Sequence, residues 1–190
     1  MSKEPIGAGC KLDVEPWRPA VFGYMPCGDS VVQMPTKKMT SDEIEQFLLN
    51  ARVGRLGLSS PSGPYIVPLG YVYADGKIFF HTCSKGLKMK LLEDNTSVCF
   101  EVDESFSDGS MYKSVIVFGN AEVISDKERM ISYLQKLIDK YRVPEPFDDY
   151  MNKPGRNREK ELTAVRICVV TPTKTTGKKF IAKSDFHSFT

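Results

Sequence analysis

The chain has 190 residues, 41% of them hydrophobic and 26% charged, a balance typical of a globular domain with a substantial core. Its 26 basic and 24 acidic residues are interspersed and leave a net charge of +2, so the composition does not point to nucleic acid as a partner. The chain shows no bilayer-spanning apolar run, no signal-peptide pattern and no CxxC among its five cysteines, so we expect a reducing, cytoplasmic setting without a membrane, a disulfide framework or a metal site.

The N-terminal part of the chain differs in composition from the rest. Residues 1–36 contain five prolines and several glycines without clear periodicity, which predicts an irregular extension. Its aromatic residues, which include the only tryptophan, Trp17, predict packing on the main domain or on a partner subunit. We expect one folded domain over residues 37–182 and a short tail over residues 183–190.

Regular structure begins with a helix. Thr40 and Glu43 match the capping-box pattern, and the apolar residues that follow fall on one helical face: Ile44, Phe47, Leu48 and Ala51. Alternation over residues 53–59 then predicts a strand. After Pro-Ser-Gly-Pro, residues 65–80 predict a hairpin with an Asp-Gly turn at residues 74–77 and a short buried second arm at residues 78–80.

The second half of the chain adds strands and one long helix. Residues 84–93 predict a short helix with Leu87, Leu91 and Leu92 turned inward. Two strands are predicted at residues 97–102 and 113–124, the second with Gly119 as a bulge or a point of close approach.

An apolar stripe over residues 126–141 predicts the best-defined helix, and a Pro-rich charged loop then leads to a last strand at residues 162–170. About six mostly hairpin-linked antiparallel strands, with helices at the corners, predict a mainly β fold with flanking α-helices. The expected architecture is a small closed or partly closed barrel.

Four lysines gather around the end of the second hairpin arm: Lys77, Lys85, Lys88 and Lys90. The predicted helix starts at the same place, after Ser84, Lys85 and Gly86. Free N–H groups at a helix start, together with a lysine, favour an anion such as a phosphate. The simpler alternative is a solvated helix face, because most lysines lie on the surface.

The motifs form an ordered set. VPLGYVYADGKIFFHTCSKGLKMKLLEDNTSVCFEV at residues 67–102 is followed by YKSVIVFGNAEVI at residues 112–124, a helix and a late TGK at residues 176–178. This set, over residues 39–180, resembles the FMN-binding split-barrel superfamily, the fold of pyridoxamine 5'-phosphate oxidase, and within it most of all the nitroimidazole-resistance (Nim) proteins. The resemblance implies a six-stranded antiparallel split β-barrel and a homodimer with two FMN molecules at the subunit interface.

The resemblance also implies roles for particular residues. Lys88 would grip the FMN phosphate, with Lys85 as a weaker candidate, and His81 would lie beside the flavin as the catalytic residue. The implied cofactor-binding residues are Val67, Pro68, Leu69, Gly70, His81, Thr82, Lys85, Leu87, Lys88 and Ser114. A structural role is the alternative for each of them, and Arg52 and Arg55 are expected to form salt bridges at the dimer seam.

The resemblance favours an FMN-dependent oxidoreductase that reduces small organic oxidants such as nitroimidazole-type nitroaromatics, although it leaves open whether the chain is an enzyme. No GxGxxG follows a predicted strand, so no resident NAD-binding domain is expected. One alternative is a flavin- or haem-binding module without its own turnover, in which His81 would be a haem ligand. A pyridoxamine-phosphate oxidase activity is a third possibility, but the chain lacks basic residues of that branch.

Overall fold

The computed structural model of the protein describes residues 36–181. The predicted extension and tail therefore lie outside the described residues, apart from Thr36, and remain predictions. No helix within residues 36–181 is both long and apolar enough to cross a membrane.

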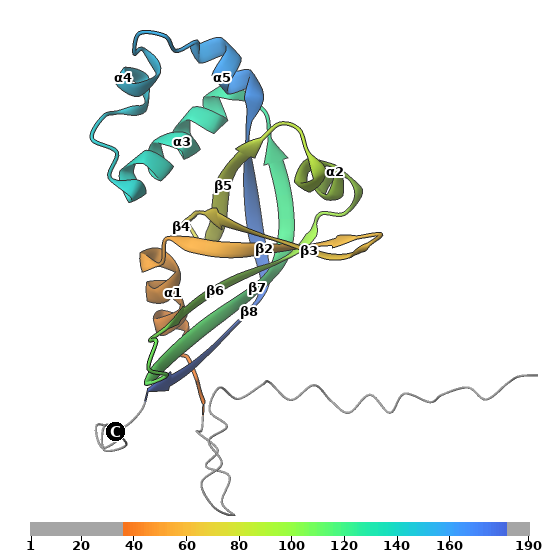
Figure 1. The fold of residues 1–190 in the computed structure, drawn as a ribbon, viewed down its shortest axis with the longest axis vertical. Coiled ribbons are helices and arrows are strands. Elements are labelled where there is room, and N and C mark those ends of the chain that lie inside the picture. The colour runs from red at the N-terminus through yellow and green to blue at the C-terminus, as the bar shows by residue number, and fades with distance from the viewer. Residues whose placement is uncertain (1–35, 182–190) are drawn as a thin grey trace, which may run out of the picture. The chain divides into compact units, whose positions relative to one another are not determined.

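The described residues form one antiparallel sheet of eight strands with helices around it (Figure 1). The strands are β1 (Lys37–Lys38), β2 (Val53–Ser60), β3 (Gly63–Gly70), β4 (Val72–Ala74), β5 (Lys77–Cys83), β6 (Ser97–Ser105), β7 (Met111–Ile124) and β8 (Val165–Ile181). The helices are α1 (Ser41–Asn50), α2 (Leu87–Asp94), α3 (Lys127–Tyr141), α4 (Phe147–Met151) and α5 (Arg158–Ala164). The sheet order is β3-β2-β6-β7-β8-β5-β4, and β1 pairs with β8. The predicted mainly β fold of the split-barrel type is confirmed, although the described residues form eight strands rather than the predicted six.

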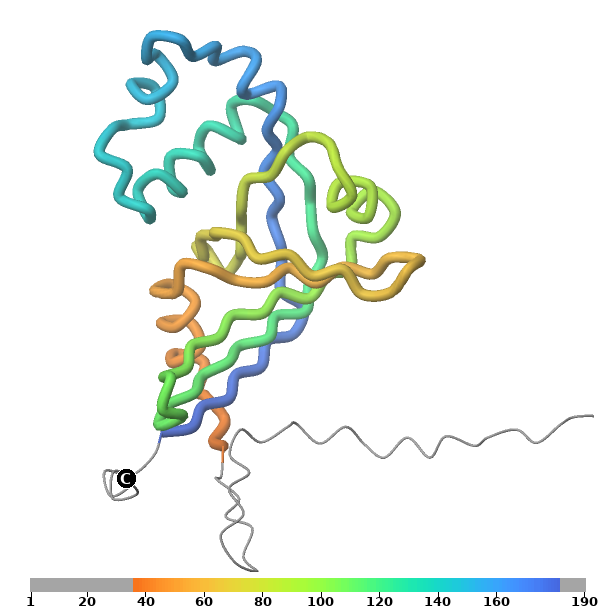
Figure 2. Tube along the Cα trace, viewed as in Figure 1, coloured from red at the N-terminus to blue at the C-terminus, as the bar shows by residue number. Residues whose placement is uncertain are grey.

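The long strands β7 and β8 connect the two ends of the domain (Figure 2). Their pairing runs from Met111 opposite Ile181 to Ile124 opposite Ile167, with a register shift at Phe118/Gly119. A Cβ atom at Gly119 would lie 2.4 Å from the carbonyl oxygen of Thr171, so this position requires glycine. The predicted bulge is confirmed.

The predicted start of α1 is also confirmed. The Thr40 N–H donates to Glu43 Oε2 at 3.0 Å, and the Glu43 N–H donates to Thr40 Oγ1 at 3.3 Å, which completes the capping box. Phe47 and Leu48, on the predicted apolar face, are buried.

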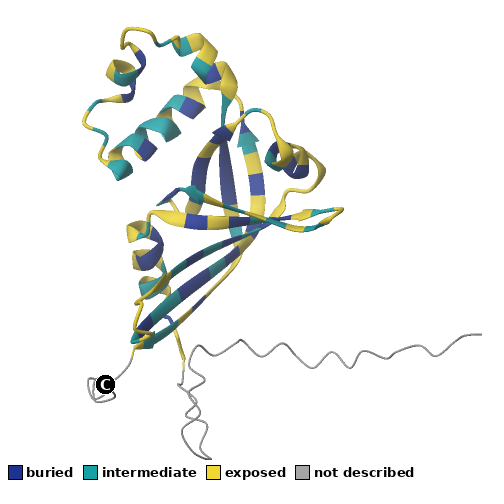
Figure 3. Ribbon diagram, viewed as in Figure 1, coloured by how far each residue is buried: buried dark blue, intermediate teal, exposed yellow. Residues whose placement is uncertain are grey.

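The buried residues form two clusters (Figure 3). One includes Phe80, Leu56 and Phe100, and the other includes Phe79 with residues of the helices α3, α4 and α5. Because neighbouring residues of a strand point to opposite faces, Phe79 and Phe80 belong to different clusters, and β5 is buried on both faces. This explains why residues 78–80 form a continuous apolar run.

The predicted hairpin is wrong in its first arm. Residues 63–70 pair with β2, and only residues 72–74 pair with β5. Tyr71, which is fully buried, lies between the two ladders. The predicted turn itself is confirmed, since Asp75 and Gly76 both have positive φ angles, 52° and 72°.

Two further predictions are corrected. The Pro-rich segment after α3 is not a plain loop, because it contains α4 and α5, whose Phe147, Met151 and Leu162 are buried in the second cluster. Leu162 therefore belongs to a helix, and the last strand runs over residues 165–181 rather than 162–170. Tertiary burial stabilises these two short helices, which local sequence signals alone do not indicate.

Candidate functional site

The end of β5 and the start of α2 make the first part of the site, which we call the lysine site: His81, Thr82, Gly86 and Lys88. Along β5, Phe80 and Thr82 are buried while His81 and Cys83 are exposed. The loop to α2 is fixed where the Ser84 N–H donates to the Ala164 carbonyl at 2.7 Å. Gly86 has a φ of 115° and caps α2 without a side-chain hydrogen bond, so the first N–H groups of this helix have no side-chain acceptor at the cap.

Lys88 lies in the first turn of the same helix. Its side chain is half-buried, with Nζ 5.7 Å from the centroid of the Phe80 ring. Burial lowers the pKa of Lys88, and no carboxylate among the described residues offsets this loss of hydration. A half-buried lysine in the first turn of a helix whose cap offers no side-chain acceptor is suited to bind a phosphate dianion.

His81 is the side chain of the lysine site that most resembles a catalytic residue. Desolvation, and then the positive charge of Lys88, lower the pKa of His81 below its ordinary value. The imidazole is therefore mainly neutral at pH 7, with one donor and one acceptor nitrogen. Burial raises the pKa of the Cys168 thiol to about 12, so that thiol is not a nucleophile at neutral pH.

Two other predicted residues near α2 are exposed, Lys85 and Leu87. The expectation that Leu87 turns inward is wrong, because 53% of its surface is exposed. The helix begins at Leu87 rather than at Ser84, so its buried face consists of Met89, Leu91 and Leu92. A role of Leu87 in cofactor binding stays a prediction.

The predicted ring-binding segment, Val67–Gly70, is the last half of β3. β3 lies at one end of the sheet order, so Pro68 is on an edge strand. An edge strand tolerates proline because proline has no N–H group to donate to a neighbouring strand. Val67 and Leu69 pack against the first buried cluster, and Pro68 is exposed opposite Arg55.

Gly70 has a structural explanation that the sequence did not suggest. A Cβ atom there would lie 2.5 Å from the hydroxyl oxygen of Tyr141, at the end of α3.

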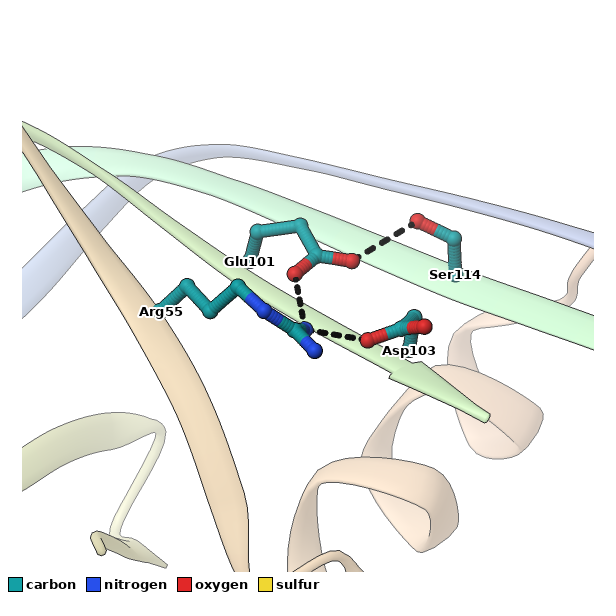
Figure 4. Close-up of polar contacts among 4 residues, drawn as sticks. All are labelled: Arg55, Glu101, Asp103 and Ser114. Atoms are coloured by element: carbon teal, nitrogen blue, oxygen red, sulfur yellow. Dashed lines mark hydrogen bonds and ion pairs between the residues drawn. The ribbon is translucent and has the colours of Figure 1, made fainter. Parts of the chain in front are cut away.

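Ser114 belongs to a polar cluster that we call the Arg55 cluster: Arg55, Glu101, Asp103 and Ser114 (Figure 4). Arg55 pairs with Glu101 at 2.9 Å and with Asp103, and the Ser114 hydroxyl lies 3.5 Å from Glu101 Oε1. Burial raises the pKa of Glu101, and the hydrogen bond from Arg55 opposes this shift. The salt bridges expected of Arg55 are therefore found within one chain.

A groove that the sequence analysis missed begins at Arg55 and Glu101. It has a volume of about 470 Å³, and its floor includes Gly57 and Cys99, which lie opposite each other on β2 and β6. Ile66 and Phe118, 64% and 45% exposed, line its sides. The alternation of apolar with polar or small residues along β2 and β6 could have predicted this groove, because residues two apart on a strand lie on the same face.

Within one chain, the lysine site and the Arg55 cluster lie beside different parts of the strand β8. Thr82 pairs with Arg166, near the start of β8, and Ser114 pairs with Lys178, near its end. Twelve residues of extended strand separate these positions, about 40 Å along the chain. Figure 2 shows the start of β7 and the end of β8 at one end of the domain, and α2 nearer the other.

Metal ligation receives no support from the side chains described. Residues 36–181 contain no group of three or more His, Cys, Asp or Glu side chains placed to hold a metal ion.

Comparison with known proteins identifies the fold. The model of the family described as "Pyridoxamine 5'-phosphate oxidase" matches residues 40–179. No curated protein sequence matches the chain.

Three solved structures illustrate the similarity. An FAD-binding protein from Mesorhizobium loti is 23% identical, with a TM-score of 0.59, over 77% of this chain and 99% of its own. A candidate 5-nitroimidazole antibiotic resistance protein from Bacteroides thetaiotaomicron is 22% identical, with a TM-score of 0.62, over 78% of this chain and 89% of its own. An FAD- and haem-binding protein from Mycobacterium smegmatis is 16% identical, with a TM-score of 0.60, over 78% and 74%. At these identities the likeness establishes the fold.

Proposed function

The chain belongs to the pyridoxamine 5'-phosphate oxidase family, and from this premise we propose that it is an FMN-binding flavoprotein that reduces small organic oxidants. The observation that carries the proposal is the lysine site. Lys88 is a half-buried cation without a carboxylate partner among the described residues, and it stands in the first turn of a helix whose cap, Gly86, offers no side-chain acceptor. A phosphate dianion would satisfy both features at once.

The remaining predicted contacts extend from this anchor. His81 and Thr82 precede the lysine loop on β5, and the charge of Lys88 acts on His81. The segment Val67–Gly70 lies on an edge strand, where backbone groups not used in a ladder can meet the polar edge of a flat ring. The cofactor, when bound, supplies the electron or hydride transfer.

His81 is the residue to which we assign a catalytic role. It is exposed and mainly neutral at pH 7, so its imidazole can donate a hydrogen bond to an organic oxidant without adding a second charge beside Lys88. Small nitroaromatics are the proposed oxidants. The Bacteroides relative, which is described as a 5-nitroimidazole resistance protein, supports this choice by analogy of fold.

Ser114 supports a homodimer. Ser114 and Thr82 pair with β8 residues that are twelve apart, so we assign Ser114 to a flavin held at Lys88 of a second copy of the chain. The face that carries Ser114 also exposes Ile66 and Phe118, which is apolar surface that a partner subunit would cover.

The cofactor is tested by mass spectrometry and a visible spectrum of the purified protein, followed by titration of the flavin-free protein with FMN and with FAD. We expect FMN to be released on denaturation and to bind more tightly than FAD. A haem band in the spectrum would favour the haem-binding alternative. A colourless protein that binds neither flavin would refute the proposed function.

The catalytic role is tested with His81→Ala, which should bind FMN normally but reduce nitro compounds more slowly. A hydrogen-bond donor placed at developing negative charge contributes typically about 100-fold or more to rate. If the variant reduces them at the parental rate, His81 has no catalytic role.

The shared site is tested by mixing two defective variants, Lys88→Met and Ser114→Ala, and letting their subunits exchange. If each site takes Lys88 from one chain and Ser114 from the other, a mixed dimer contains one intact site, and random pairing restores about a quarter of all sites to parental affinity. If both residues acted within one chain, no site would be restored. Sedimentation of the parent as a monomer would rule out the shared site altogether.

A further inference from the structure

The corner between β3 and β4 depends on the end of α3. At Tyr71 the chain leaves its pairing with β2 and begins its pairing with β5, so the Tyr71 N–H falls between two ladders. The Tyr141 hydroxyl accepts a hydrogen bond from this N–H at 3.0 Å and donates its own to the carbonyl oxygen of Arg52. One hydroxyl group therefore joins the corner to the segment that follows α1.

Glycine at position 70 makes this contact possible. The hydroxyl oxygen of Tyr141 lies where any Cβ atom at Gly70 would come within 2.5 Å of it. The Arg52 guanidinium, just before β2, makes a cation–π contact with the Tyr141 ring, 5.4 Å from its centroid. The position of Tyr141 and the path of the chain at Gly70 are thus fixed together.

Lys140 makes a second tie at the same corner. Its Nζ atom donates to the Ala51 carbonyl oxygen at 2.7 Å and lies 4.3 Å from the centroid of the Tyr71 ring. The Tyr71 hydroxyl in turn donates to the Leu48 carbonyl oxygen at 2.8 Å, in the last turn of α1. The last two residues of α3 and the C-terminal end of α1 therefore converge on one fully buried tyrosine.

We propose that Lys140 and Tyr141, which we call the α3 clamp, are positioning residues that hold the segment Val67–Gly70 in the place where it meets the flavin ring. The inference rests on the proposed function, because it takes from it the contact of this segment with the ring. Neither residue touches the cofactor. They act through Gly70 and Tyr71, which fix the end of the edge strand.

The role of the α3 clamp in flavin binding can be tested separately from that of Lys88. Only molecules with an ordered corner present the segment to the ring, so the apparent flavin affinity falls with the fraction of molecules in which the corner is ordered. The ring is common to FMN and riboflavin, so loss of the clamp should weaken both ligands by the same factor. A change at Lys88, by contrast, should weaken FMN alone.

The test is Tyr141→Phe, which keeps the ring and removes the hydroxyl. Dissociation constants for FMN and riboflavin are measured by quenching of flavin fluorescence, well below the melting temperature of each variant. We expect both constants to rise by the same factor, up to about tenfold, because a buried N–H loses its acceptor. Tyr133→Phe is the matched control, since this tyrosine of α3 packs edge-on against Phe79 and lies outside the corner. It should change neither constant.

Lys140→Met provides a second variant if Tyr141→Phe fails to fold, and it should weaken both ligands in the same direction by a smaller factor. Parental affinity in a folded clamp variant, or a loss confined to FMN, would overturn the positioning role and leave the proposed function standing. If the parent itself binds no flavin, the proposed function fails and this inference fails with it.

Discussion

Replacing Lys88 by methionine tests the phosphate anchor most directly, because methionine keeps the length of the side chain and its contact with Phe80 but removes the charge. A charge-assisted contact to phosphate contributes about 1.5–3 kcal/mol, so the FMN dissociation constant should rise roughly 10- to 150-fold. Riboflavin, which lacks the phosphate, should bind the variant as well as it binds the parent. The ratio of FMN to riboflavin affinity is therefore the quantity to measure, by titration of the flavin-free protein.

The same variant should have an opposite effect on the flavin-free protein. Burial lowers the pKa of Lys88, which means that the folded chain holds this charge at a cost. Without FMN, Lys88→Met should melt at a higher temperature than the parent, and with saturating FMN the order should reverse.

Lys90→Met, an exposed lysine on the same helix, is the control and should change neither FMN affinity nor melting temperature. Parental FMN affinity in Lys88→Met would remove Lys88 from the site and refute the reasoning from its burial.

Three further predictions concern stability. Thr40→Ala removes the capping box and should lower the free energy of unfolding by about 1 kcal/mol in urea denaturation. Gly119→Ala places a Cβ atom 2.4 Å from the backbone oxygen of Thr171, so it should lower the melting temperature markedly, and an unchanged value would contradict the bulge geometry. Burial and then Arg52 lower the pKa of Lys140 to about 8. Lys140 therefore binds fewer protons in the folded chain than in the unfolded chain between pH 8 and 10.5, and it contributes a rise of up to about 1.4 kcal/mol per pH unit to the free energy of unfolding there. The raised pKa of Cys168 acts in the opposite direction, so the quantity to measure is the difference in slope between the parent and Lys140→Met.

Structural features that depend on a short stretch of sequence were predictable. The capping box at Thr40, the turn at Asp75 and Gly76, and the bulge at Gly119 each depend on residues close together in the chain or on one backbone requirement. The ordered motifs also identified the family, because their order and spacing reflect the whole sheet.

The second buried cluster could not be predicted in the same way. α4 has five residues and follows a proline, and its first N–H donates to the side chain of Gln135 at 2.9 Å. A helix this short exists because Phe147 and Met151 are buried against α3, and that contact is invisible in a local reading of a charged, Pro-rich segment.

Gly70 shows how a correct motif can have an unexpected cause. The resemblance assigned this glycine to the flavin, and that role remains a prediction. The structure gives it a second reason, because Tyr141, seventy-one residues later, occupies the space that a side chain would need. A glycine in a binding motif can therefore serve the scaffold and the ligand together, and substitution at Gly70 alone would not separate the two roles. The variants at Tyr141 and Lys88 do separate them, since one acts on the ring and the other on the phosphate.

Strand register places the strongest condition on the site. The sequence assigned Thr82, Lys88 and Ser114 to one cofactor, but Thr82 and Ser114 pair with β8 residues that are twelve apart. Twelve extended residues correspond to about 40 Å along β8, far more than one side chain reaches. On the proposed assignment of both residues to one flavin, Ser114 comes from a second copy of the chain, and the dimer would complete the site.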